Sequence, residues 1–429
     1  LDETFGAKGA KVAEANKICA QAGYDLAEDA YKGRKLVEPV RPQKGARRLL
    51  ISGSEAMALG ALAANVRFYS AYPMSPATPI MEFLAAKARA LGLVVEQAED
   101  EISAVNMVIG ASFCGARSMV ATSGGGLALM VEAISLAGMT ETPLVVVDCQ
   151  RPAPATGLPT RTEQADLLFV AHGAHGEFPR AILAPATAEE AFFLTVKAFA
   201  LAEKYQTPVF VLGDQLLNDS SWTEEPFDLK NARREGRGLL SGKELAEAPR
   251  YGFKRYAVTE SGISPRILPG TPGQVLYADS DEHTAEGHIT ESADVRREMV
   301  GKRLRKGKGL AEEMAPPRVF PDDRAGSYVV SWGSTFGAVE EAVGRLRDKG
   351  MDIGYLHFSE VYPLREDAVP PPLRDRAELI AVENNATGQF AKLLRMETGL
   401  NIEKRVLKFD GRPFSGQELA RAIEASKGG

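Results

Sequence analysis

The sequence predicts an α/β protein built on a parallel sheet that is covered on both faces, with a smaller α/β unit after it. From Arg48 onwards, short apolar segments alternate with helical segments, the pattern of strand–helix–strand units. The apolar segments, such as LVVVDC, are mostly continuous runs without in/out alternation, which indicates strands buried on both faces. The pattern stops near residue 222 and restarts at SYVVSWGS for about 100 residues, enough for a small doubly wound domain.

In the first unit, residues 47–222, strands and helices follow one another closely. We expect strands at 49–53, 66–72, 93–97, 118–122, 144–149, 181–185 and 207–213. We expect helices at 54–65, 80–91, 101–113, 127–138 and 187–204, the first with Ser54 as its N-cap. The second unit, residues 327–429, has expected strands at 327–334, 352–358, 379–383 and 405–409 and helices at 336–348, 388–398 and 415–426.

Two other segments do not follow the α/β pattern. Residues 223–326 are rich in glycine and proline, then polar, then basic, and we expect mostly extended or irregular chain that connects the two units. Residues 1–33 are helical in pattern, with Gly33 as the stop, and they resemble the end of another domain. Residues 34–46 contain two prolines and four basic residues and are predicted to be a linker. Because the chain begins without Met, we expect further residues upstream.

Composition excludes several classes of protein. A chain of 429 residues predicts two or three domains, and 45% hydrophobic with 25% charged residues is typical of a soluble globular protein. A net charge of −6 argues against a nucleic-acid partner, and no apolar run is long enough to suggest a membrane span. Cys19, Cys114 and Cys149 are scattered, which argues against a disulfide framework or an iron–sulfur site and fits a reducing, cytoplasmic compartment. His283 and His288 do not match a metal-ligand spacing, so we predict no metal on this chain.

Glu99, Asp100 and Glu101 lead directly into an apolar run, Ile102 to Gly115, that is predicted to be a helix buried on most sides. Such acids either form a solvated start of the helix or include a carboxylate that is buried because it has a functional role. The sequence pattern alone does not rank the three.

Three further segments follow predicted strands, so they lie at the carboxyl edge of the sheet, where ligands of open α/β folds bind. The glycine turn SGGG (Ser123 onwards) is either close backbone packing or an approach surface for a ligand. YPMSPATP offers Ser75 and Thr78, which are either helix N-caps or ligand donors. QRPAPATGLPTRTEQADL offers Arg151 and Arg161, which are either solvated or able to clamp a carboxylate.

In the second unit, VENNATGQFAKLLR is predicted to be an ordinary turn between a strand and a helix. Asn384 and Asn385 end the strand, and we expect an asparagine in the left-handed conformation there. No dinucleotide or nucleotide fingerprint of glycines accompanies any strand, which disfavours a nicotinamide-binding protein.

Together these motifs resemble the α subunit of 2-oxoacid:ferredoxin oxidoreductases, especially the 2-oxoglutarate branch. The resemblance is carried by YPMSPATP, EDEISAVNMVIGAS, ATSGGG and RPAPATGLPTRTEQADL, then by SGISPRILPG, EHTAEGHIT and MVGKR, and finally by SWGSTFGAVEEAV, EVYPL and VENNATGQFAKLLR. It covers residues 47–429 in the family's order, and residues 1–46 resemble the tail of a fused γ domain with its linker.

The resemblance implies that residues 47–222 form a pyrimidine-binding domain for thiamine diphosphate and that residues 327–429 form a transketolase C-terminal-like domain. The diphosphate, Mg²⁺ and a [4Fe–4S] cluster are expected on a partner β subunit. The implied assembly is an (αβ)2 heterotetramer, with a γ domain fused or separate. The implied reaction is oxidative decarboxylation of 2-oxoglutarate with coenzyme A and ferredoxin, or its reverse.

The resemblance also assigns residues. Glu101 matches the family's glutamate, a carboxyl that hydrogen-bonds N1′ of thiamine and makes its 4′-amino group a base. Tyr72, Pro73, Ser123 and Gly124 are implied to lie at the cofactor.

Ser75, at a position where the family usually has threonine, and Arg151 are implied to hold the 2-oxoacid carboxylate. Arg161 and Thr162 are implied to lie near the far end of the substrate, where an arginine suits a second carboxylate. Two alternatives remain open: the same chemistry on pyruvate, branched-chain or aryl 2-oxoacids, and a non-catalytic assembly subunit.

Overall fold

The structure is a computed structural model that describes residues 1–34, 45, 47–232, 238–249, 252–321 and 324–427. It contains two compact units, residues 1–47 and 48–429. Most of the predicted linker, residues 35–44 and 46, lies outside the described residues. Among the helices in the described part of the chain, none combines the length and the apolar character needed to cross a membrane.

The N-terminal unit is helical over residues 1–34. A short helix, α1 (Asp2–Phe5), and a 3₁₀ turn, η1 (Gly6–Lys8), precede the long helix α2 (Ala10–Ala30). The helix ends three residues before the predicted stop, because Tyr31 is its C-cap and Gly33, with φ of 81°, lies in the turn that follows. Of the residues described in this unit, only Ala13 is buried.

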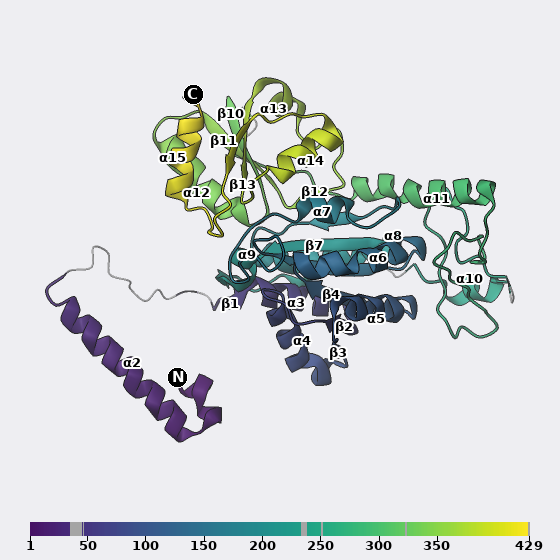
Figure 1. Ribbon diagram of the computed structural model, residues 1–429, viewed down its shortest axis with the longest axis horizontal. Helices are drawn as coiled ribbons and strands as arrows, with labels where there is room; N and C mark the ends of the chain where they lie inside the picture. The colour runs from purple at the N-terminus through teal and green to yellow at the C-terminus, as the bar shows by residue number, and fades with distance from the viewer. Residues whose placement is uncertain (35–44, 46, 233–237, 250–251, 322–323, 428–429) are drawn as a thin grey trace. The chain divides into compact units, whose positions relative to one another are not determined.

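The main unit is organised around a seven-stranded sheet with the order β12-β6-β7-β5-β4-β2-β3 (Figure 1). All its pairings are parallel except that between β12 and β6. The strands are β2 (Phe68–Ala71), β3 (Val94–Gln97), β4 (Ser118–Thr122), β5 (Leu144–Gln150), β6 (Ala181–Leu183), β7 (Pro208–Asp214) and β12 (Glu360–Tyr362). The predicted parallel sheet is therefore confirmed, with one antiparallel strand contributed from much later in the chain.

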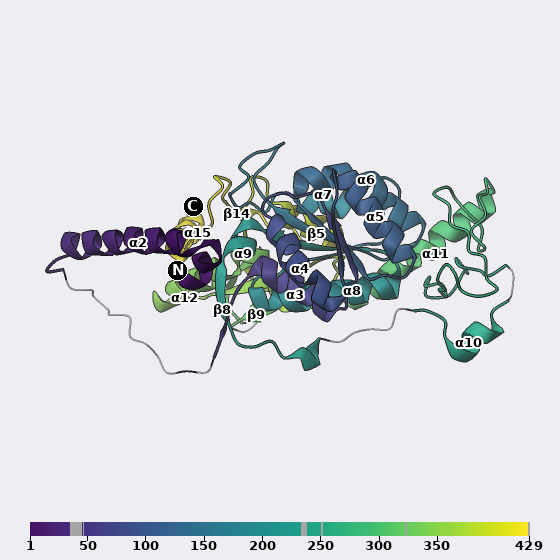
Figure 2. The same cartoon turned by 90° about the horizontal axis from the view of Figure 1, so that it is seen from below.

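Helices cover both faces of this sheet, as the apolar strands predicted. Val145 and Val147 of β5 share a core with α3 (Gly53–Ala63), α4 (Thr78–Leu91) and α8 (Ala188–Tyr205). Val146, between them, points into a second core with α5 (Glu101–Phe113), α6 (Gly124–Met139) and α7 (Leu167–His172). Figure 2 shows β5 between these two layers of helices.

The first predicted strand forms a separate ribbon. β1 (Leu49–Ser52) pairs antiparallel with β8 (Ser221–Glu224), which follows α9 (Gln215–Asp219). The prediction of Ser54 as the N-cap of α3 is wrong. Ser52 is the cap, because its hydroxyl accepts from the Glu55 backbone while the Glu55 carboxylate accepts from the Ser52 backbone.

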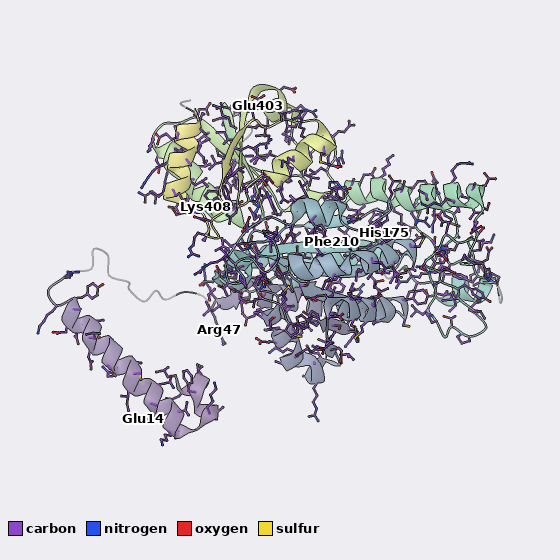
Figure 3. The ribbon with its side chains drawn as sticks, in the orientation of Figure 1. Glu14, Arg47, His175, Phe210, Glu403 and Lys408 are labelled. Carbon is purple, nitrogen blue, oxygen red and sulfur yellow. The ribbon has the colours of Figure 1, made fainter. Side chains whose placement is uncertain are left out.

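The second sheet has the order β14-β13-β10-β11-β9 and is parallel except at β9. Its strands are β9 (Arg318–Phe320), β10 (Ser327–Trp332), β11 (Ile353–Phe358), β13 (Glu378–Glu383) and β14 (Lys404–Leu407). The core on one face includes residues of α12 (Phe336–Asp348) and α15 (Gly416–Lys427), and the core on the other includes residues of α13 (Pro371–Arg376) and α14 (Gln389–Thr398). The latter core is continuous with that of the first sheet, where Phe210 lies in β7 (Figure 3).

The segment between the two sheets contains more helix than predicted. Besides η2 (Leu229–Asn231) and α10 (Gly242–Glu247), it holds the 20-residue helix α11 (Ala293–Glu312), so the prediction of irregular chain is wrong there. Its buried residues recur at helical spacing but are mostly basic: Met299, Lys302, Arg303, Lys306 and Leu310. A charged stripe of this kind looks solvent-exposed in a sequence. It is buried here because Glu141 pairs with Lys302 and Lys306 and Glu282 pairs with Arg303.

Candidate active site

The three acids before α5 have different environments. Asp100 is the N-cap of the helix, its carboxylate accepting from the Ser103 backbone at 2.7 Å, and Glu99 is exposed. Glu101 begins the helix and is only 4% exposed, and its Oε1 has no hydrogen-bond partner among the described residues. A buried carboxylate oxygen without a donor is costly, so this one indicates a group that the chain alone does not supply.

The prediction that helix α5 is buried on most sides is wrong. Ala104, Val105 and Val108 lie in the core, whereas Ile102 is 50% and Met107 42% exposed. On the side away from the core, the helix therefore exposes two large apolar side chains, with the polar Asn106 between them.

The glycine turn packs tightly against two acids. Helix α6 begins at Gly124 in this turn. An added Cβ at Gly124 would lie 2.5 Å from Asp166 Oδ2, and one at Gly126 would lie 2.6 Å from Glu101 Oε1. At Gly125 the nearest atom would be 4.0 Å away. Close packing thus explains why positions 124 and 126 are glycine, whereas the backbone at Gly125 is open.

Ser123 precedes this turn and is the N-cap residue of α6, yet its hydroxyl makes no capping hydrogen bond. The hydroxyl is completely buried and has no partner among the described residues. Among the described residues, Ser123 Oγ is therefore a second buried polar atom without a partner, besides Glu101 Oε1, against which Gly126 of the same turn packs.

The turn after β2 lies at the same edge. The predictions that Ser75 or Thr78 caps α4 are wrong, since Ala77 is its N-cap and makes no side-chain hydrogen bond. Tyr72 and Ser75 are exposed, and Pro73 is partly exposed. The Arg151 guanidinium donates to the Ser75 carbonyl at 2.8 Å, which brings together two residues that are 76 positions apart.

The two residues expected at the far end of a substrate differ in exposure. The side chain of Arg161 is exposed. Thr162 is buried, and its hydroxyl donates to Asp214 Oδ1 at 3.2 Å and accepts from the Leu216 backbone at 3.3 Å. Thr162 therefore anchors the loop, while Arg161 projects from it.

Sequence reasoning missed a group of acids beneath this loop. Asp148 is fully buried, with neither carboxylate oxygen hydrogen-bonded within the described chain. Burial and the neighbouring Asp166 raise the pKa of Asp148 well above its ordinary value. Burial also raises the pKa of Asp166 to about 6, against the opposing charge of Arg151.

Burial and the neighbouring Asp166 likewise raise the pKa of Glu163 to about 7. The signal that could have revealed this group was an acid, Asp148, inside the apolar strand LVVVDC.

The asparagines after β13 do not adopt the predicted left-handed conformation, which belongs to Gly388 with φ of 66°. Instead the Asn385 carboxamide oxygen accepts from the Gly388 backbone at 2.8 Å, and its amide donates to the Gln164 carbonyl at 3.0 Å. The turn thus contacts the loop that carries Arg161.

Comparisons with known proteins identify relatives of this chain. Residues 59–302 match the family model described as pyruvate flavodoxin/ferredoxin oxidoreductase, thiamine diphosphate-binding. The chain is 36% identical to subunit alpha of 2-oxoacid:ferredoxin oxidoreductase 1 from Sulfurisphaera tokodaii over 426 residues, which are 95% of this chain and 65% of that protein. It is 32% identical to 2-oxoglutarate synthase subunit KorA from Methanothermobacter thermautotrophicus, covering 87% of this chain and 97% of that protein.

Among solved structures, 2-oxoglutarate:ferredoxin oxidoreductase from Magnetococcus marinus, with 2-oxoglutarate, coenzyme A and succinyl-CoA bound, superposes with a TM-score of 0.88 at 33% identity. The match covers 99% of this chain and 73% of that one.

Proposed function

The chain belongs to the family of alpha subunits of 2-oxoacid:ferredoxin oxidoreductases, and on that premise we propose that it forms the thiamine-pyrimidine half of an active site for oxidative decarboxylation of 2-oxoglutarate. The reaction would use coenzyme A and pass electrons to ferredoxin, or run in reverse as a carboxylation. The observation that carries the proposal is the buried Glu101 carboxylate at the carboxyl edge of the sheet, one oxygen of which has no partner in the part of the chain that the structure describes.

The residues present fit the pyrimidine ring of thiamine diphosphate. When bound, this cofactor supplies a nucleophilic carbon for attack on the 2-oxo group. Glu101 would share a proton with the ring nitrogen N1′, which satisfies its unpaired oxygen. An added Cβ at Gly125 would have no neighbour nearer than 4.0 Å, so the backbone there is open. Ser123, Gly124, Tyr72 and Pro73 would line the site of the ring.

The substrate would be held by charge. Arg151, kept in place by the Ser75 carbonyl, would bind the carboxylate next to the reacting carbon, with the exposed Ser75 hydroxyl beside it. Arg161 would bind the second carboxylate of 2-oxoglutarate, while Thr162 keeps its loop in place through Asp214. This assignment favours a dicarboxylic 2-oxoacid as substrate. Pyruvate, which the description of the family model names, has no second carboxylate for Arg161 to bind.

A partner subunit would complete the site. We propose that a β subunit holds the diphosphate, Mg²⁺ and a [4Fe–4S] cluster, in an (αβ)2 assembly. The exposed apolar side chains of Ile102 and Met107 on α5 and Leu129 on α6 support such a cover over the helices that border the site. The presence of Glu101, Ser75 and Arg151 together speaks against a purely non-catalytic role, because the proposed chemistry would use all three.

The experiment that tests this proposal uses the complex of the full polypeptide with its partner subunit. We expect 2-oxoglutarate with coenzyme A to reduce viologen, and Glu101→Gln to lower turnover by at least about 100-fold while the complex still assembles. Glu99→Gln, at the exposed neighbouring acid, is the matched control and should keep normal turnover. Near-normal activity in Glu101→Gln would remove the central assignment.

A further inference from the structure

The carboxyl edges of the two parallel sheets converge on residues 162–166, the end of the loop that carries Arg161. From the first sheet, Asp214 at the end of β7 accepts from Thr162 at 3.2 Å. From the second sheet, the Ser334 hydroxyl just after β10 donates to the other oxygen of the same Asp214. One buried carboxylate therefore joins the loop to both sheets.

Gln164 is the centre of this junction. It is completely buried, and its side chain donates to the Trp332 carbonyl at 2.9 Å and accepts from the Asn384 backbone at 3.1 Å. Its backbone donates to the Asn384 carbonyl at 2.7 Å and accepts from the Asn385 amide at 3.0 Å. All four polar groups of this one residue are thus satisfied by the ends of β10 and β13.

The neighbouring residues extend the same contact. The Gln389 side chain bonds the Ala165 carbonyl and the Leu168 backbone, which fixes the chain after Gln164. On the other side, the turn after β14 packs on Arg161. An added Cβ at Gly411, whose φ is 77°, would lie 3.2 Å from Arg161 Cβ. Lys408, which begins this turn, lies at the end of the second α/β unit nearer the seven-stranded sheet (Figure 3).

We propose that Gln164 is a positioning residue for substrate selection, which fixes the place of the exposed Arg161 guanidinium from inside the protein. The second α/β unit then determines, through Trp332, Asn384 and Asn385, which 2-oxoacid the first unit binds. This inference deepens the proposed function and rests on it. Its physical basis is that Arg161 lies in an exposed loop, where the buried anchors at Thr162 and Gln164, together with the turn at Gly411, limit its freedom.

The test compares Gln164→Met with Gln206→Met in the assembled complex, using 2-oxoglutarate and pyruvate as substrates. Methionine has a similar length but cannot make the two side-chain hydrogen bonds of Gln164. Gln206 is also buried, donates to the Ser264 carbonyl at 2.7 Å and lies outside the site. Its variant therefore also loses a buried side-chain hydrogen bond, one against the two that Gln164 loses. Arg161→Ala serves as the positive control for recognition of the far carboxylate.

We expect Gln164→Met to raise KM for 2-oxoglutarate about tenfold with a smaller change in kcat. The preference for 2-oxoglutarate over pyruvate should fall in Gln164→Met and in Arg161→Ala and stay at the wild-type value in Gln206→Met. A purely structural role would lower the melting temperature of both glutamine variants without changing this preference.

Three other results would overturn the inference, and they differ in whether the proposed function also fails. If Arg161→Ala changes the preference and Gln164→Met does not, the positioning role of Gln164 is overturned while the proposed function stands. If neither variant changes it, the assignment of Arg161 fails and the role of Gln164 fails with it. If no 2-oxoacid drives viologen reduction in the wild-type complex, the proposed function itself is wrong, and so is the inference that depends on it.

Discussion

Replacing Gly126 with alanine should destabilise the protein, although alanine is the better helix former. An added Cβ would lie 2.1 Å from Thr122 Oγ1 and 2.6 Å from Glu101 Oε1, far inside contact distance, so both side chains must move. Overpacking of this kind costs about 1–3 kcal/mol. The gain in helix propensity from glycine to alanine is only about 1 kcal/mol. The net change therefore ranges from roughly zero to a loss of about 2 kcal/mol.

Gly125→Ala is the matched control, one position earlier in the same helix. The atom nearest to its Cβ would be the Ala155 carbonyl oxygen at 4.0 Å, so no overpacking is expected. This variant should therefore only gain stability from the higher helix propensity of alanine. The two variants should differ by about 1–3 kcal/mol in unfolding free energy, measured by urea denaturation at equal m-values. Equal stability of the two variants would show that Glu101 does not pack against the first turn of α6.

Two further predictions concern buried acids. Burial alone would raise the pKa of Glu141, but the charges of Lys306, Lys302 and Arg255 outweigh this effect and lower the pKa to about 2. The ionised Glu141 therefore stabilises the fold at pH values above the ordinary pKa of 4.5, and this stabilisation is lost as the pH falls towards 2. Glu141→Gln should therefore lower the unfolding free energy by about 3–5 kcal/mol at pH 7, measured by denaturant unfolding. The difference from wild type should become smaller in acid, and a difference that does not change with pH would contradict the assignment. Burial and the neighbouring Asp166 raise the pKa of Asp148, so this carboxyl lowers the stability of the wild type as the pH rises above its ordinary value of 3.8. The difference in melting temperature between Asp148→Asn and wild type should therefore shift in favour of the variant as the pH is raised from 3.8. A pH-independent difference between Asp148→Asn and wild type would show that Asp148 is ionised in the folded protein.

The sequence predicted the architecture of the first sheet well, because burial on both faces requires apolar residues at successive strand positions. Val145, Val146 and Val147 illustrate this, since they point alternately into two different helical layers. The start of α5 was also predictable, since an acid placed directly before an apolar run can serve as a cap, as Asp100 does.

Helix α11 and the asparagine turn were not predictable by the same reasoning. The buried face of α11 carries Lys302 and Lys306, and nothing local to that segment reveals that Glu141, about 160 positions earlier, neutralises them. Asn385 likewise contacts Gln164, which is 221 positions away, so its local sequence suggested only a turn.

By itself, the sequence determined the alternation of helices with the parallel strands of the two sheets, and the sheet edge at which the candidate site residues lie, because periodicity and parallel connections are local properties. The tertiary structure alone decided which of the three acids is buried without a partner. It also decided that Thr162 anchors a loop from which Arg161 projects, and that the loop is held between two sheets through Gln164. These are properties of contacts between distant segments, and desolvation and pairing at such contacts depend on neighbours that no local pattern specifies.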